Sequence, residues 1–103
     1  MLFRSRYEEA LALIERALAI RPDEPAFIDS MGWVLFRLGR LDEALIQLER
    51  AYELFPNDEV ASHLGEVLWS LGEKRKAKKV WREAIKKTPD SSYLLDVYKR
   101  FEL

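Results

Sequence analysis

The amino-acid sequence predicts an all-α fold in which antiparallel helical hairpins stack side by side as an α-solenoid. Three observations lead to this prediction: a motif that repeats every 33 or 34 residues, apolar residues at helical spacing, and a glycine or proline at the helix ends. The chain has 103 residues, of which 49% are apolar, so it is long enough for one core. We therefore expect a single domain over residues 1–103.

The repeat is carried by small residues and prolines that recur in register. Between the later two copies the spacing is 33 residues, and it pairs Gly32 with Gly65, Gly39 with Gly72, Ala44 with Ala77, Ala51 with Ala84 and Pro56 with Pro89. Between the earlier two copies the spacing is 34 residues, and it pairs Ala10 with Ala44, Ala17 with Ala51 and Pro22 with Pro56. Such self-similarity is typical of repeat architectures.

Each copy consists of two predicted helices. The six helices are expected over residues 6–20, 25–38, 42–54, 58–71, 74–87 and 91–101. In the second helix one apolar face holds Phe27, Met31, Val34, Leu35 and Leu38, and in the third it holds Leu45, Leu48, Tyr52 and Phe55. In the last helix Leu94, Leu95, Tyr98 and Phe101 are expected to cover the end of the stack, while Asp96, Lys99 and Arg100 face water.

The helix ends follow from residues with strong backbone preferences. Gly39 is expected to end the second helix, because glycine tolerates the left-handed conformation common there. Asp42 and Glu43 suit the positive start of the third helix. Pro56 ends that helix, because the residue before a proline disfavours helical dihedral angles. Asn57 and Asp58 can then cap the following helix.

The residue content argues against catalysis and against a membrane span. The chain has no cysteine and one histidine, His63, and it lacks an H-x-x-x-H pattern, a phosphate loop or a cofactor fingerprint. Asp29, Glu59 and Glu66 can face one another, but charge-rich helices produce such groups by chance. We therefore expect no enzyme activity, no cofactor and no metal site. No apolar run approaches the ~18 residues of a membrane span.

The net charge of −1 conceals a strongly basic segment. Residues 73–87 carry eight Lys or Arg and two Glu, whereas residues 1–72 carry seven Lys or Arg and thirteen Asp or Glu. A basic helix of this kind can attract nucleic acid, although a solvated outer face is the favoured interpretation because few stacking aromatic residues accompany it.

The residues in register resemble the tetratricopeptide repeat family. The positions that carry the resemblance are Gly32, Ala44, Ala51 and Pro56, then Leu64, Gly65, Ala77, Ala84 and Pro89, and, in an earlier half copy, Tyr7, Ala10, Ala17 and Pro22. The sequence departs from the family pattern where Ile28 and Ala61 replace a first-helix tryptophan, and where Leu41 and Lys74 replace an aromatic residue that opens the second helix.

The resemblance implies a right-handed superhelical solenoid and a non-catalytic protein–protein interaction scaffold. It divides the chain into the second half of a repeat (6–24), two full repeats (25–57 and 58–90) and a capping helix (91–103). Since residues 6–24 supply only half a repeat, we expect the chain to be part of a longer array. The family's close packing implies that Gly32 faces Ala44 and that Gly65 faces Ala77.

In the family, the first helices of the repeats line a concave groove that binds peptides. The positions that match this groove are Asp29, Trp33, Phe36, Arg37, Glu59, Glu66 and Trp69. Aromatic rings anchor interfaces, and the carboxylates favour a partner of basic or aromatic character. Trp33 is expected to be exposed, because Glu66 occupies the same place in the next copy. For Phe36 and Trp69 core packing is an equal alternative, and Trp81 is expected in the core.

Two other functions remain open. The apolar N-terminal half repeat can pair with a second copy as a homodimer or assembly contact. A more remote alternative is a nucleic-acid contact through residues 74–87. Binding of a chaperone's terminal carboxylate is not expected, because Asp29 and Trp33 stand where Lys and Asn would be needed.

A narrower resemblance concerns residues 29–72, which are similar to the C-terminal repeats of bacterial tetratricopeptide lipoproteins of the cell envelope. Some members of that group act as adaptors that present substrates to a periplasmic protease. This resemblance implies a periplasmic, outer-membrane-associated protein, and without it the expected location is the cytoplasm.

Overall fold

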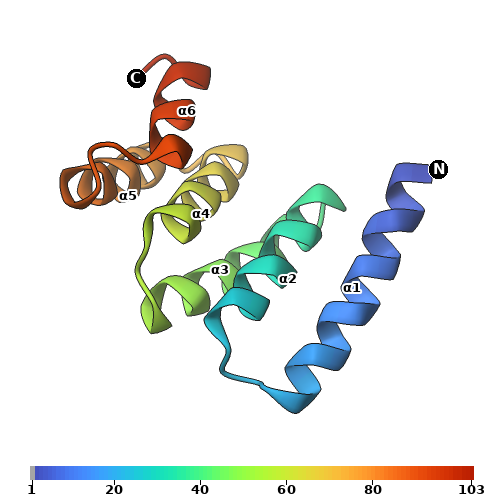
Figure 1. The fold of residues 1–103 in the computed structure, drawn as a ribbon. Coiled ribbons are helices and arrows are strands. Elements are labelled where there is room, and N and C mark those ends of the chain that lie inside the picture. The colour runs from blue at the N-terminus through green and yellow to red at the C-terminus, as the bar shows by residue number, and fades with distance from the viewer. Residues whose placement is uncertain (1) are drawn as a thin grey trace.

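The computed structural model describes the backbone of residues 2–103 and the side chains of residues 6–103. This part of the chain contains helices and no strand (Figure 1). The helices are α1 (Leu2–Ile20), α2 (Pro25–Arg37), α3 (Leu41–Leu54), α4 (Asp58–Ser70), α5 (Lys74–Lys87) and α6 (Ser92–Arg100). The predicted all-α class is confirmed, and the first helix begins earlier than the sequence pattern predicts.

The helices form two layers. Helices α2 and α3 make one antiparallel hairpin and α4 and α5 make the next, with α3 packed on α4 (Figure 1). Helix α2 also contacts α4, and α4 contacts α6. These three helices therefore form one layer, in which neighbouring helices are separated by one repeat of the sequence. Helix α6 therefore occupies the place that the first helix of a further repeat would take.

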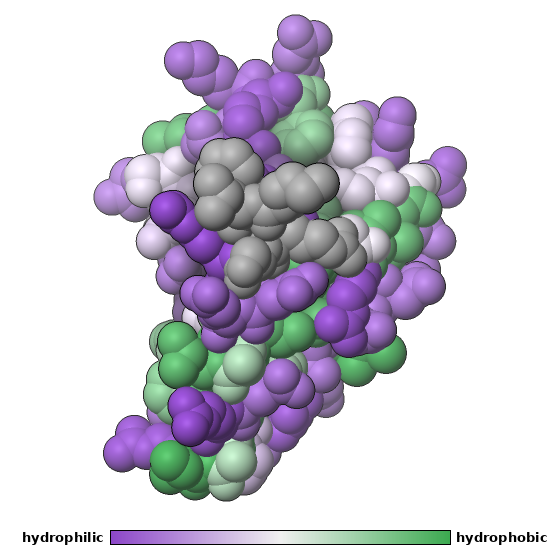
Figure 2. All heavy atoms as spheres, turned by 90° about the vertical axis from the view of Figure 1, so that its right-hand side faces the viewer, coloured by the Kyte–Doolittle hydropathy of each residue, from purple (hydrophilic) through white to green (hydrophobic). Residues whose placement is uncertain are grey.

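Helix α1 lies at the edge of the stack, where it packs mainly on α2. Figure 2 looks at this edge and shows hydrophobic side chains interspersed with hydrophilic ones in its lower half. Two of the exposed apolar side chains, Leu13 and Ile20, belong to α1 and are 61% and 81% exposed. Across residues 2–103 no helix combines the length and apolar character needed to cross a bilayer.

Glycine ends α2 and α4 by the predicted mechanism. Gly39 and Gly72 have φ angles of 80° and 87°, in the left-handed region. The backbone N–H groups of the residues that follow, Arg40 and Glu73, donate to carbonyl oxygens in the last turn of the preceding helix, at 2.9 and 2.8 Å. This pattern is a Schellman motif, and it turns the chain sharply into the second helix of each hairpin.

Side-chain caps fix the starts of α4 and α6. Asn57 Oδ1 accepts a hydrogen bond from the Val60 N–H at 2.8 Å, as predicted. Ser91 Oγ accepts from the Leu94 N–H at 3.2 Å and donates to Asp58 Oδ2 at 2.6 Å. The second of these bonds ties the start of α6 to the start of α4.

Each hairpin is held by a large side chain that packs directly on a glycine. A Cβ atom added at Gly32 would lie 2.5 Å from Leu48 Cγ, and one added at Gly65 would lie 2.0 Å from Trp81 Nε1. Both Leu48 and Trp81 are fully buried. The Trp81 indole N–H donates to the Ser62 carbonyl oxygen at 3.4 Å, so the predicted core position of Trp81 is confirmed.

The expected partners of these glycines need correction. The sequence pairs Gly32 with Ala44 and Gly65 with Ala77, but the nearest atoms to the added Cβ belong to the residue one turn later, Leu48 or Trp81. The nearest Ala44 atom is its backbone oxygen, at 3.4 Å from the position at Gly32. The two alanines are fully buried and keep the helices close, which brings the larger side chains onto the glycine backbone.

Three of the four residues expected to cover the end of the stack, Leu94, Tyr98 and Phe101, pack on the core. Leu94 and Val97 are buried, and the Phe101 ring packs 5.1 Å from the Trp81 ring and 5.0 Å from the Trp69 ring. Leu95, in contrast, is half exposed and does not cover the core. The helical period turns its side chain away from α4.

Replacing Gly65 by Ala tests the glycine contact. Overpacking costs about 1–3 kcal/mol, so we expect the free energy of unfolding to fall by about 2 kcal/mol or more, because the buried Trp81 ring cannot move aside. Urea unfolding followed by far-UV circular dichroism measures this loss. Ser30→Ala, at an exposed position of α2, is the control and should change stability by less than about 0.5 kcal/mol. If Gly65→Ala is as stable as the control, the proposed close contact between Gly65 and the Trp81 ring is contradicted.

Candidate functional site

Two neighbouring hollows open on the layer formed by α2, α4 and α6. The first has a volume of about 280 Å³ and is lined by Trp33, Ser62, His63, Glu66, Ser92, Tyr93, Asp96 and Arg100. The second has a volume of about 400 Å³ and is lined by Ile14, Asp29, Ser30, Trp33, Val34, Glu59 and His63. Trp33 and His63 line both hollows, so they stand between them.

Trp33 is a half-buried platform at the centre of this surface. Its ring stacks on the His63 ring with centroids 4.2 Å apart and planes at 22°, and it also contacts the Phe36 ring at 5.0 Å. The sequence predicts an exposed indole. In the structure the ring packs on His63 of α4, and Trp33 still lines both hollows, so it is neither fully exposed nor sealed in the core.

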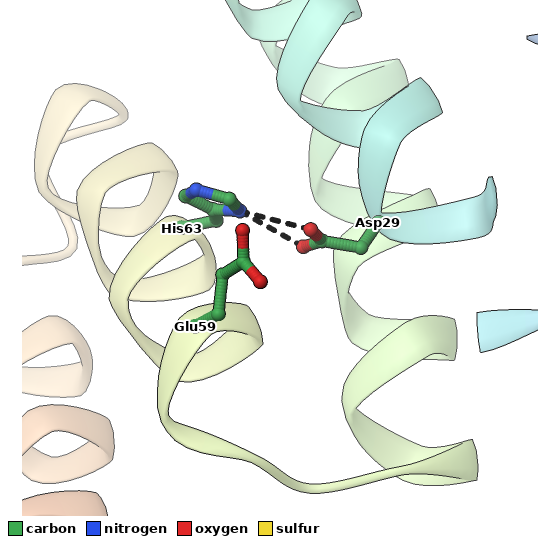
Figure 3. A group of neighbouring side chains, drawn as sticks. All are labelled: Asp29, Glu59 and His63. Atoms are coloured by element: carbon green, nitrogen blue, oxygen red, sulfur yellow. Dashed lines mark hydrogen bonds and ion pairs between the residues drawn. The ribbon is translucent and has the colours of Figure 1, made fainter. Parts of the chain in front are cut away.

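A carboxylate and an imidazole join α2 to α4 beside this platform. Asp29 extends from α2 toward His63 on α4, and His63 Nδ1 lies 2.9 Å from Asp29 Oδ1 and 3.1 Å from Oδ2 (Figure 3). Glu59, one turn before His63 on α4, brings a second carboxylate to the same place. One carboxylate oxygen of Asp29, one of Glu59 and one imidazole nitrogen of His63 all lie within 4.8 Å of one another. His63 is thus hydrogen-bonded to a carboxylate of the neighbouring repeat.

An ion pair joins α4 to α6 on the other side of the platform. The Arg100 guanidinium donates from Nη1 to Glu66 Oε1 at 2.7 Å, from Nη2 to Glu66 Oε2 at 3.2 Å, and from Nε to Asp96 Oδ2 at 2.7 Å. The hydrogen bond to Glu66 raises the pKa of Arg100 above its usual value, so this side chain stays charged. Arg100 and Asp96 are both exposed to water, as predicted, and the ion pair with Glu66 one repeat earlier is a further contact that the sequence did not predict.

Three of the seven residues predicted for the groove line neither of these two hollows. Phe36 packs on the core as well as on Trp33. The Arg37 Nε–H donates to the Tyr7 hydroxyl of α1 at 3.1 Å, with its guanidinium over the Tyr7 ring. Trp69 is partly buried and its ring contacts the rings of Trp81 and Phe101, which favours the core alternative. The other four, Asp29, Trp33, Glu59 and Glu66, line one hollow or the other.

Sequence reasoning missed the contributions of α6 and of His63. Tyr93, Asp96 and Arg100 line the first hollow, although the sequence assigned α6 only to the end of the stack. A signal was present in the repeat spacing. The pairs Asp29–His63 and Glu66–Arg100 are both separated by 34 residues, so each joins equivalent turns of successive helices in one layer.

The basic helix α5 presents its charges on the opposite side from its buried residues Ala77, Trp81 and Ala84. The ammonium groups of Lys74 and Lys78 lie 5.1 and 6.0 Å from the centroid of the Trp69 ring. These two lysine side chains thus lie over the ring of Trp69, which packs on the core. This arrangement agrees with the interpretation of α5 as a helix with a solvated outer face.

Stacked hairpins with one layer of helices facing two hollows define a helical-repeat scaffold. Two family models, both described as tetratricopeptide repeat, match residues 4–59 and residues 61–91. The first of these covers more than half of the chain, and the chain therefore belongs to the tetratricopeptide repeat family. Members of this family are generally non-catalytic protein–protein interaction modules.

Similar proteins carry the same repeat. The TPR repeat-containing protein PA4667 of Pseudomonas aeruginosa is 48% identical over 62 residues, which are 60% of this chain and 10% of that protein. This chain therefore spans about a tenth of that relative. The name of that protein states only the repeat, so the narrower resemblance to envelope lipoproteins stays a prediction.

Solved structures share the fold. TTC0263, described as a thermophilic TPR protein of Thermus thermophilus, superposes with a TM-score of 0.83 at 26% identity, covering 91% of this chain and 48% of that one. The structure of MamA AMB-1 superposes with a TM-score of 0.72 at 23% identity, covering 90% of this chain and 51% of that one. The second likeness supports the fold alone.

Proposed function

We propose that this chain is a non-catalytic adaptor that binds a peptide or protein segment with basic and aromatic side chains across the Trp33 platform. The observation that carries the proposal is the position of Trp33, whose indole lines both hollows on the layer of α2, α4 and α6. A single extended segment crossing this ring can place side chains in both hollows.

The charge of the surface supports a basic partner. Asp29 and Glu59 line the second hollow, while Glu66 and Asp96 line the first. Among the residues that line these two hollows, the four carboxylates outnumber the one Lys or Arg side chain, which is Arg100. Local excess of negative charge steers cationic segments to the surface and favours Lys or Arg side chains in the bound state.

Aromatic contact supplies the affinity in this proposal. Trp33 and Tyr93 lie on different helices and line the same hollow, and Tyr93 is 44% exposed. Aromatic side chains are frequent anchors of interfaces, and a cation placed over an indole adds to the attraction. Since α2 and α6 are held to α4 by the Asp29–His63 and Glu66–Arg100 pairs, the platform is organised before a partner binds.

Peptides selected from a displayed random library against the native protein test this function, with fluorescence anisotropy as the measurement. We expect selected peptides to be rich in Lys, Arg and aromatic residues, and to bind more weakly at high salt. Tyr93→Ala and Trp33→Leu should each weaken binding at least tenfold, about 1.4 kcal/mol.

The matched control is Ile46→Ala, which removes an exposed apolar side chain from α3, outside both hollows. Its affinity should stay within about twofold of native, as expected for a residue outside the interface. Thermal unfolding of each variant separates lost binding from lost folding. Selected peptides that bind both groove variants as tightly as the native protein would rule out the proposed surface.

Self-association is a second candidate function, favoured by the exposure of Leu13 and Ile20 on α1. A contiguous exposed apolar patch marks an interaction surface. Sedimentation velocity over a wide concentration range should then show a dimer that Ile20→Lys dissociates. A monomer at all concentrations would exclude this candidate.

A further inference from the structure

We propose that Asp29, Glu59 and His63 form a binding site for a first-row divalent transition-metal ion, with Zn²⁺ as the reference ligand. The three side chains supply two carboxylates and one imidazole, whose ligand atoms all lie within 4.8 Å of one another (Figure 3). This site goes beyond peptide binding, since an ion here would join α2 to α4 whether or not a partner is bound.

The backbone already places the three donors correctly. Glu59 and His63 are four residues apart on α4, so they project from the same face one turn apart. Asp29 approaches from α2, and Figure 3 shows its carboxylate pointing at the imidazole. A site that draws ligands from two packed helices is held by the fold rather than by a flexible loop.

The distances require little adjustment. Zn²⁺ binds nitrogen and oxygen ligands at about 2.0–2.1 Å, which separates two tetrahedral ligand atoms by about 3.3 Å. His63 Nδ1 and Asp29 Oδ1 are now 2.9 Å apart, so a small opening admits the ion between them. Glu59 is only partly buried, and its side chain can rotate to supply the third ligand.

Charge favours a divalent ion at this position. The side chains of Asp29 and His63 are only 10% and 14% exposed, so the Asp29 carboxylate is poorly hydrated. Glu59 adds a second negative charge close by. One divalent cation neutralises both carboxylates, and the low exposure strengthens that attraction.

The surroundings allow an ion to enter and to keep open coordination positions. All three ligands line the hollow of about 400 Å³, so water or a partner's side chain can complete the coordination. The stacked Trp33 ring holds the imidazole plane in place. An imidazole among the donors favours Zn²⁺, Co²⁺ or Ni²⁺ over Mg²⁺ and Ca²⁺, which prefer oxygen ligands.

Isothermal titration of the metal-free 103-residue protein with ZnCl₂ tests the site. We expect one Zn²⁺ per chain, micromolar or tighter affinity, and a melting temperature that rises with added Zn²⁺ and returns with EDTA. The Co²⁺ form should show the visible absorption of a protein-bound ion. MgCl₂ at the same concentration should do neither.

Glu59→Gln provides the sharpest variant, because it removes a ligand and leaves the Asp29–His63 pair intact. Its Zn²⁺ affinity should fall at least tenfold while its metal-free melting temperature stays near native. Glu53→Gln, which removes an exposed carboxylate from α3, is the matched control and should bind Zn²⁺ like the native protein. No saturable one-to-one Zn²⁺ binding by the native protein, or equal affinity of Glu59→Gln and the native protein, would overturn the proposal. Neither result depends on the peptide-binding function.

Discussion

Two positions without a side chain set the geometry of this molecule. At Gly32 and Gly65 the helix backbone is bare, and the fully buried Leu48 and Trp81 side chains pack against it. Each glycine lowers helix stability by about 1 kcal/mol, whereas burying a large apolar side chain contributes about 1.5–3 kcal/mol. The hairpin contact therefore gains more than the glycine loses, and it determines how closely the two helices approach.

The repeat spacing sets the functional layer. Each hairpin stacks on the previous one, and one repeat separates them in the sequence. Equivalent turns of α2, α4 and α6 therefore lie side by side. Polar residues can then pair across the layer, as Asp29 does with His63 and Glu66 with Arg100, each pair 34 residues apart. Trp33 lies between these two pairs and is held by His63. The surface proposed for binding is thus positioned by the first helices of successive hairpins, and each of α2 and α4 is joined to its own second helix by a glycine contact.

Most of the fold was predictable because its signals are local or repeated. The apolar period, Gly39 in the left-handed region and the Asn57 cap depend on neighbouring residues, and the burial of Trp81 follows from its register with Leu48. The surroundings of Trp69 were harder to predict, because they include Phe101, which reaches the core through the packing of α6 on α4. The role of α6 in the first hollow was missed for the same reason, as Arg100 and Glu66 meet only through tertiary packing.

Nuclear magnetic resonance of the native protein tests the glycine contact most directly. The account predicts strong nuclear Overhauser effects between the Gly65 Hα protons and the Trp81 indole, and a large ring-current shift of those protons, because the indole lies against the glycine backbone. Gly65 Hα protons at ordinary chemical shifts, with no cross-peak to the Trp81 ring, would contradict it.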